Sequence, residues 1–161
     1  MKKSVHFSHK SDEWETPQAL FDSLQAEFGG FRCDVAATKD NKKCDAYITA
    51  KEDALNASWM NTNWCNPPYS RVKEFVKKAT EEAGKGKLTV MLIPARTDTI
   101  FFHDYIYEKP NVEVRFLRGR IKFINPDGPL LRGSKMNGSN NSAPFPSMIV
   151  IFRPKEKQNK K

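Results

Sequence analysis

The chain has 161 residues, of which 39% are hydrophobic and 11% aromatic, so it can bury one hydrophobic core and is not expected to be disordered. No apolar run approaches the roughly 20 residues of a membrane span, and residues 1–6 lack the apolar segment of a secretory signal. Cys33, Cys44 and Cys65 are far apart and form no CxxC pair. We therefore expect reduced thiols in a cytoplasm, with no membrane, disulfide framework or metal site.

A surplus of basic residues is the second global feature, with 27 Lys and Arg against 19 Asp and Glu and a net charge of +8. A basic surface favours a polyanionic partner, although solubility alone also explains many basic proteins. We expect a flexible N-terminus over residues 1–12, one domain over 13–153 and a basic disordered tail over 154–161. Outside the tail, basic residues concentrate in two stretches, one from Arg115 to Lys135 and one made of Arg71, Lys73, Lys77, Lys78, Lys85 and Lys87.

The first predicted helix spans residues 17–28 and carries an apolar face at helical spacing. Thr16 is a suitable N-cap, Pro17 suits the first helical position, and Gly29 follows the helix end. Three short strands are then expected over residues 31–35, 46–49 and 60–65.

A second helix is predicted between a capping Ser70 and Gly84. Residues 88–93 are almost wholly apolar, as in a central parallel strand that is buried on both faces. Asp98 can cap a third helix, which ends before Pro110. Further strands are expected over residues 112–117, 121–123 and 147–152. Strands that alternate with helices predict an α/β open sheet.

The tetrapeptide Asn66-Pro67-Pro68-Tyr69 directly follows a predicted strand, where open α/β sheets bind ligands. The Asn66 amide oxygen and the rigidly held Pro67 carbonyl can both accept hydrogen bonds from one NH2 group, and Tyr69 offers a face for stacking. Accepting both hydrogens draws the nitrogen towards sp3 character and exposes its lone pair to an electrophilic methyl group. The alternative is a plain Pro-Pro turn, but this string should arise by chance less than about once in a thousand such chains.

Over residues 13–152 the chain resembles the compact phage-type, Dam-like DNA N6-adenine methyltransferases in the ordered motifs WETP, DVAA, NPPYS, LIPARTDT, FHDYI, GRIKF and APFPSMIVIF. The resemblance implies a single-domain, Rossmann-like S-adenosylmethionine-dependent methyltransferase fold with a mixed, mostly parallel sheet. It implies transfer of a methyl group from S-adenosylmethionine to N6 of a flipped adenine in double-stranded DNA. No metal, membrane or obligate protein partner is expected, and the location would be a bacterial cytoplasm.

The same resemblance implies roles for the motif residues. Asn66, Pro67, Pro68 and Tyr69 would form the catalytic motif, with Tyr69 stacked on the flipped base. Thr16 and Pro17 would contact the methionine end of the donor, Asp34 its ammonium, and Asp53 its adenine, while a helix cap or a solvated loop is the alternative for either aspartate. The predicted donor site comprises Trp14, Thr16, Pro17, Asp34, Ala36 and Asp53.

Two features depart from the larger methyltransferases. Ala36-Ala37-Thr38 replaces the usual glycine-rich turn, and no separate domain for target recognition is expected. The ribose could be bound by Asp40, Asn41 or Asp45, and the sequence does not choose among them. DNA contacts are expected from the loop 125–142, from the helix 71–78, and from Arg96, Arg118, Arg120, Lys122, Arg132 and Lys135.

Other interpretations remain open. The NPPY motif also occurs in enzymes that methylate RNA or a protein glutamine, and the missing glycine-rich turn is compatible with a catalytically inactive DNA-binding module. Arg96 could bind either a phosphate or Asp98. His103 is expected to be a packed core histidine, and Phe145, between two prolines, is either a prop beneath the flipped base or the start of an edge strand.

Overall fold

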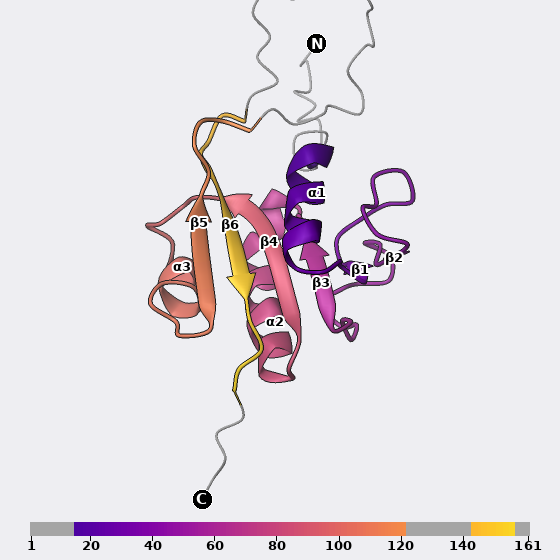
Figure 1. The fold of residues 1–161 in the computed structure, drawn as a ribbon. Helices are drawn as coiled ribbons and strands as arrows, with labels where there is room; N and C mark the ends of the chain where they lie inside the picture. Colours follow the sequence, from indigo (N-terminus) through magenta and orange to yellow (C-terminus); the bar gives the residue numbers. More distant parts are fainter. Residues whose placement is uncertain (1–14, 122–142, 157–161) are drawn as a thin grey trace, which may run out of the picture.

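The computed structural model describes residues 15–121 and 143–156, which form a six-stranded sheet in the order β2-β1-β3-β4-β6-β5 (Figure 1). All pairings among the first four strands of this order are parallel, and β6 runs antiparallel to both β4 and β5. The predicted α/β class with a mixed, mostly parallel, Rossmann-like sheet is confirmed. The strands are β1 (Cys33–Asp34), β2 (Ala46–Tyr47), β3 (Thr62–Cys65), β4 (Leu88–Pro94), β5 (Val112–Phe116) and β6 (Ser147–Phe152).

The helices cover both faces of the sheet, with α1 on one face and α2 on the other (Figure 1). Strand β4 shows why two layers are needed, because successive side chains of a strand point to opposite faces. Its Val90 and Leu92 pack in the core beneath α1, whereas Met91 and Ile93 pack in the core beneath α2. The prediction of a central strand buried on both faces is confirmed. The helical segments are α1 (Gln18–Glu27), the 3-10 helix η2 (Tyr69–Arg71), α2 (Val72–Gly84) and α3 (Ile100–Tyr105).

The start of α1 corrects the predicted N-cap. Pro17 occupies the N-cap position, and no side chain caps the helix. The Thr16 hydroxyl instead accepts a hydrogen bond from the side-chain amide of Asn66, at 3.0 Å. Thr16 therefore joins the start of α1 to the end of β3, a contact that local sequence rules cannot anticipate.

Two further predicted caps were wrong. Ser70 lies inside η2, which continues directly into α2, so Arg71 takes the N-cap position of that helix. Thr99 is the N-cap residue of α3 in place of Asp98, and the Thr99 hydroxyl donates to the Arg96 carbonyl at 2.8 Å. In both places a tight turn at the end of the preceding segment displaces the expected cap.

Several predicted segments differ from the structure in length or fall outside it. The first two strands contain two residues each, shorter than expected. Ile121 belongs to no strand, and residues 122–123 lie outside the described residues. The same holds for the N-terminal segment 1–12, the loop 125–142 and most of the tail. None of the helices in the described part of the chain is long and apolar enough to cross a membrane.

Part of the basic stretch predicted for DNA is used inside the protein. The Glu82 side chain is fully buried near the end of α2 and pairs with the ammonium groups of Lys78 at 3.1 Å, Lys85 at 2.9 Å and Lys87 at 2.8 Å. Lys87 also donates to the Trp59 carbonyl. Burial alone would raise the pKa of Glu82, but the hydrogen bonds from the three lysines lower it to about 2.

A second ion-pair cluster uses Arg115, another residue of the predicted basic surface. Its guanidinium makes two hydrogen bonds with the Glu27 carboxylate, at 2.6 and 2.7 Å, and a third with Glu113 at 2.6 Å. Arg153 binds the other oxygen of Glu113 at 2.7 Å. These contacts join the end of α1 to the outer strands of the sheet, so the Arg115 side chain has a structural role.

The three cysteines are free and buried. Burial raises the pKa of Cys33 to about 11 and that of Cys44 to about 12, and it raises the pKa of Cys65 well above its ordinary value. A thiol with a raised pKa is a poor nucleophile at neutral pH, because the thiolate is the reactive form.

Candidate active site

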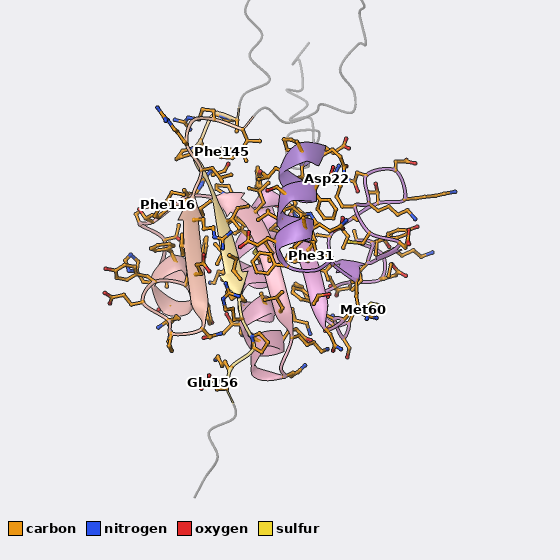
Figure 2. The ribbon with its side chains drawn as sticks, viewed as in Figure 1. Asp22, Phe31, Met60, Phe116, Phe145 and Glu156 are labelled. Carbon is orange, nitrogen blue, oxygen red and sulfur yellow. The ribbon has the colours of Figure 1, made fainter. Side chains whose placement is uncertain are left out.

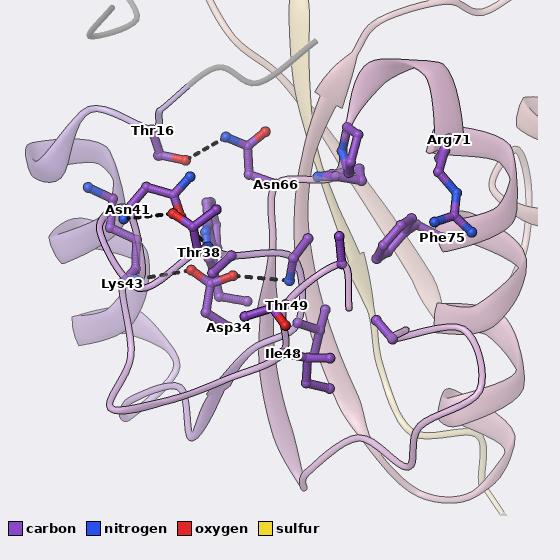
Figure 3. Close-up of a pocket in the computed structure, with 18 of the residues that line it drawn as sticks. Thr16, Asp34, Thr38, Asn41, Lys43, Ile48, Thr49, Asn66, Arg71 and Phe75 are labelled. Atoms are coloured by element: carbon purple, nitrogen blue, oxygen red, sulfur yellow. Dashed lines mark hydrogen bonds between the residues drawn. The ribbon is translucent and has the colours of Figure 1, made fainter. Parts of the chain in front are cut away.

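An open cavity lies where β1 and β3 end, beside the start of α1 and the first turn of α2 (Figure 3). The position agrees with the rule that open α/β sheets bind ligands beyond the carboxyl ends of their parallel strands. Of the residues predicted from the sequence, the cavity brings together Thr16, Asp34, Ala36, Asp53, Asn66, Pro67 and Pro68.

Asn66 follows the last residue of β3 and reaches the segment that precedes α1. Its Nδ2 donates to the Thr16 Oγ1 at 3.0 Å, and Thr16 is itself buried. The bond orients the amide group, with the nitrogen towards Thr16 and the carbonyl oxygen at the opposite end. Pro67, the next residue, is buried and holds its backbone in a restricted conformation.

Tyr69 begins η2 and packs against Phe145, which lies just before β6 (Figure 2). The two rings meet edge to face, with their centroids 5.0 Å apart and an angle of 83° between their planes. Burial raises the pKa of the Tyr69 hydroxyl, so this group is protonated at neutral pH. The contact places the Phe145 ring against the tyrosine of the motif, and its role as a prop beneath the flipped base stays a prediction.

Asp34 ends β1 and closes the loop that replaces a glycine-rich turn. Its two carboxylate oxygens accept backbone hydrogen bonds from Ala36 at 3.3 Å and from Lys43 at 3.0 Å. Burial raises the pKa of Asp34 to about 6, and these two bonds offset only part of the effect. The Asp34 carboxylate therefore stabilises the shape of this loop by accepting hydrogen bonds from its backbone N–H groups.

A reciprocal pair of bonds stabilises the same loop. The backbone N–H of Thr38 donates to the Asn41 side chain at 2.7 Å, and the backbone N–H of Asn41 donates to the Thr38 hydroxyl at 3.3 Å. Among the three ribose-binding candidates, Asn41 lines the cavity, whereas Asp40 and Asp45 are exposed and lie outside it.

Asp53 lines the cavity from the turn that follows β2. Its backbone has a positive φ of 53°, and its carboxylate accepts hydrogen bonds from the backbone of Leu55 at 3.2 Å and the side chain of Asn56 at 2.6 Å. Apolar side chains of Ile48 and Phe75 line the cavity as well. The donor-binding role predicted for Asp53 stays a prediction.

The cavity also contains charged residues that sequence reasoning missed. Glu15, Lys43 and Arg71 line it, and the guanidinium of Arg71 lies 5.9 Å from the centre of the Phe75 ring. Arg71 directly follows the NPPYS motif, so its position was a usable signal. Glu15 had one as well, because it lies in the WETP motif. Lys43 had none, because the loop between β1 and β2 that carries it has no motif of its own.

The remaining predicted residues lie elsewhere. Pro17 and Tyr69 adjoin the cavity-lining residues in the chain without lining the cavity, and Arg96, Arg118 and Arg120 are exposed after β4 and β5. Strands β4 and β5 both run antiparallel to β6, so their carboxyl ends lie at the same edge as the cavity. Predictions that lie outside the described residues are those for Trp14, Lys122, Arg132 and Lys135.

His103 corrects another expectation, because it is exposed and not packed in the core. Its Nε2 lies 2.8 Å from the Thr97 carbonyl oxygen.

In the part of the chain that the structure describes, no cluster of three or more His, Cys, Asp or Glu residues could hold a metal ion.

Comparison with known proteins gives these features a family. A model of the family described as DNA N-6-adenine-methyltransferase (Dam) matches residues 3–160. The DNA N-6-adenine-methyltransferase of Haemophilus phage HP1 is 31% identical over 158 residues, which cover 96% of this chain and 86% of that protein. The protein of the same name from Escherichia phage T1 is 36% identical over 93 residues, 56% of this chain but only 39% of its relative.

A shorter match supports the same grouping. The putative methyltransferase YfdM of Escherichia coli K12 is 37% identical over 75 residues, which cover 42% of this chain and 82% of that protein. The Dam family model covers nearly the whole chain, including every residue of the cavity and of the Asn66–Tyr69 motif. The chain belongs to the Dam family of DNA N-6-adenine-methyltransferases.

Proposed function

We propose that this DNA adenine N6-methyltransferase holds the target amino group between the Asn66 side-chain oxygen and the Pro67 carbonyl. The observation that carries the proposal is the hydrogen bond from the Asn66 Nδ2 to Thr16 at 3.0 Å. This bond engages the amide nitrogen with Thr16, so the amide oxygen of Asn66 is the atom that can accept from an NH2 donor. Two acceptors on one amino group localise its lone pair for attack on a methyl group.

S-adenosylmethionine is the methyl donor that family membership implies, and the charges that line the cavity support this assignment. When bound, it supplies an electrophilic methyl group on a sulfonium centre. Among the described residues that line the cavity, carboxylates outnumber cations. The carboxylates are Glu15, Asp34 and Asp53, and the cations are Lys43 and Arg71. This negative balance complements a ligand whose net charge is positive at neutral pH.

The donor-binding residues divide by the chemistry they offer. Thr16 would contact the methionine portion, with Pro17 next to it in the chain but outside the cavity lining. The buried Asp34 would face the ammonium, because a carboxylate favours a neighbouring cation. The adenine would lie among Ile48, Phe75 and Asp53, where apolar surface adjoins a carboxylate.

The target adenine must leave the duplex, because N6 of a stacked, paired base cannot meet the methyl group in line. Tyr69 would stack on the extruded base, and Phe145 would fix the ring of Tyr69 from the side through their edge-to-face contact. Double-stranded DNA would bind along the carboxyl edge of the sheet through Arg96, Arg118 and Arg120. Lys122, Arg132, Lys135 and the loop 125–142 remain predicted contacts.

An inactive DNA-binding module is the rival interpretation, and it rested on the missing glycine-rich turn. The loop contains no glycine-rich turn, but the Asp34 carboxylate holds it by accepting hydrogen bonds from its backbone N–H groups. An open cavity lies beside the loop. This arrangement favours a donor-binding enzyme over an inactive module. Methylation of RNA or a protein glutamine finds less support, because the named relatives are DNA methyltransferases.

The test is the substitution Asn66→Ala. We expect the methylation rate to fall about a hundredfold, since one acceptor at a reacting centre typically contributes on the order of 3 kcal/mol. The dissociation constant for S-adenosylmethionine, measured by calorimetry, should change little. Asn111→Ala is the matched control, because the Asn111 side chain also donates a hydrogen bond, to the Arg153 carbonyl, outside the cavity lining. More than half of the wild-type rate in Asn66→Ala would refute the assigned role.

A further inference from the structure

A lysine at one wall of the cavity has no role in the mechanism above. The Lys43 side chain is only 7% exposed, although its residue lies in a surface loop. Its ammonium binds the Glu15 Oε1 at 3.4 Å and the Gln18 Oε1 at 3.0 Å. Burying an ammonium is costly unless it is paired, so these contacts hold a positive charge at the cavity wall.

The cavity has two chemically different ends. Figure 3 shows Thr16, Asn41 and Lys43 on one side and Phe75 with Arg71 on the other, and Asp34 lies between them. S-adenosylmethionine is divided in the same way, with a charged amino acid at one end and a flat base at the other. An orientation that places the base near Phe75 places the amino acid near Lys43.

The loop that carries Lys43 is also joined to Asp34. The backbone N–H of Lys43 donates to the Asp34 Oδ2 at 3.0 Å, so the loop brings one anionic and one cationic residue together. The ammonium and carboxylate of an amino acid are bonded to the same carbon and need two such partners side by side. Asp34 supplies the partner for the ammonium.

We propose that the Lys43 ammonium binds the α-carboxylate of S-adenosylmethionine, an inference that rests on the proposed function. An ammonium has three N–H donors, and the bonds to Glu15 and Gln18 use two of them. Glu15 and Gln18 are positioning residues that direct the third donor towards the ligand. The site therefore recognises the amino acid as a zwitterion, and the product S-adenosylhomocysteine, which keeps the carboxylate, binds through the same contact.

The test compares two ligands and three variants by calorimetry. Decarboxylated S-adenosylmethionine keeps the sulfonium and the ammonium but lacks the carboxylate. The wild-type protein should bind S-adenosylmethionine about 10- to 100-fold more tightly than this analogue, as expected for a hydrogen bond between charged groups. Lys43→Met should lose that preference and bind the analogue as the wild type does. Lys43→Arg should retain part of it.

Lys42→Met is the matched control, because Lys42 is exposed in the same loop and packs over the Tyr47 ring, 4.8 Å from its centre. It should leave both affinities unchanged. Equal weakening of both ligands in Lys43→Met would overturn the inference and make Lys43 a structural residue. If a thermal melt shows that Lys43→Met is not folded, the inference is tested instead by the ligand preference of the wild type and of Lys43→Arg. A wild type that binds S-adenosylmethionine without preference overturns the inference alone, whereas one that binds neither ligand overturns the proposed function as well.

Discussion

The Asp34 carboxylate should have opposite pH-dependent effects on folding and on binding. Burial raises its pKa to about 6 from an ordinary 3.8. A carboxyl group whose pKa is raised by folding favours the folded state below its unfolded pKa, and this advantage is lost as the pH rises through the folded value. Ionising Asp34 therefore costs the unliganded protein on the order of 3 kcal/mol of unfolding free energy between about pH 4 and pH 6.

Binding of S-adenosylmethionine should show the reverse dependence. The ammonium of the ligand favours the ionised carboxylate, so the dissociation constant should rise about tenfold for each pH unit below 6 and level off near pH 7, below the range of about 7.7–8.0 where an α-ammonium titrates. Calorimetry between pH 5 and pH 8 measures this profile. Asp34→Asn, which cannot ionise, should bind weakly with a flat profile. A flat profile in the wild type would show that Asp34 does not face the ammonium.

Single residues differ in how far the sequence predicts them. Asn66 and Tyr69 could be recognised because they belong to one contiguous motif. A contiguous motif that directly follows a strand needs no tertiary information to locate its side chains at the end of that strand. Lys43 could not, because it lies in an irregular segment without a motif, and its ion pair with Glu15 of the WETP motif joins positions 28 apart. The contact between Thr16 and Asn66 spans 50 positions, so a local rule assigned Thr16 to a helix cap.

At the level of helices and strands, interiors were predictable and ends were not. Apolar runs and helical spacing located β4, β6 and α2, because burial selects the side chains of every buried position. The ends depend on tertiary partners. The first predicted strand, over residues 31–35, contracts to Cys33–Asp34, and the Val35 N–H bonds instead to the Trp64 carbonyl at the end of β3. Pro17, Arg71 and Thr99 occupy the N-cap positions without side-chain capping bonds.

The lysine cluster around Glu82 gives a prediction for the stability of α2. The pKa of Glu82 is lowered from 4.5 to about 2, so its ion pairs contribute stability above about pH 4.5 that declines as the pH falls towards 2. Glu82→Gln should lower the unfolding free energy by about 3 kcal/mol at pH 7, because it leaves buried cations unpaired. The effect should lie at the lower end of the range for broken buried pairs, since the Lys85 side chain is 57% exposed and can turn to water.

Urea unfolding at pH 7 and pH 3 measures this effect. The difference between wild type and Glu82→Gln should shrink at pH 3, where part of the wild-type contribution is already absent. Glu81→Gln is the matched control, because Glu81 is the exposed neighbour on the same helix. A decrease of less than about 1 kcal/mol at pH 7 would mean that the lysines find other partners.

The molecule as a whole has a chemically distinct edge at the carboxyl ends of its parallel strands. Phe116 and Phe145 lie towards that edge, whereas Met60 and Glu156 lie towards the opposite one (Figure 2). Phe116 and Ile100 are 64% and 76% exposed, unusual values for large apolar side chains. Apolar groups beside the exposed Arg96, Arg118 and Arg120 suit a surface that binds both phosphates and displaced bases.

Duplex DNA affinity should reveal which surface binds. Replacing Arg118 and Arg120 together by alanine should reduce the slope of log affinity against log salt by about one unit for each phosphate that the variant no longer neutralises. S-adenosylmethionine affinity should not change. The comparison variant replaces Lys73 and Lys77, the exposed lysines of α2. If only the α2 variant changes the slope, the DNA lies over that helix and not over the carboxyl edge.

The reactivity of the three buried thiols can report transient opening of the segments around the cavity. Each cysteine adjoins a residue of the donor cavity in the chain: Cys33 precedes Asp34, Cys44 follows Lys43, and Cys65 precedes Asn66. Because burial shields each thiol and raises its pKa, a thiol reagent can modify it only while the surrounding segment is transiently unfolded. The modification rate at each position therefore measures how often that wall of the cavity opens, and a bound methyl donor should slow all three.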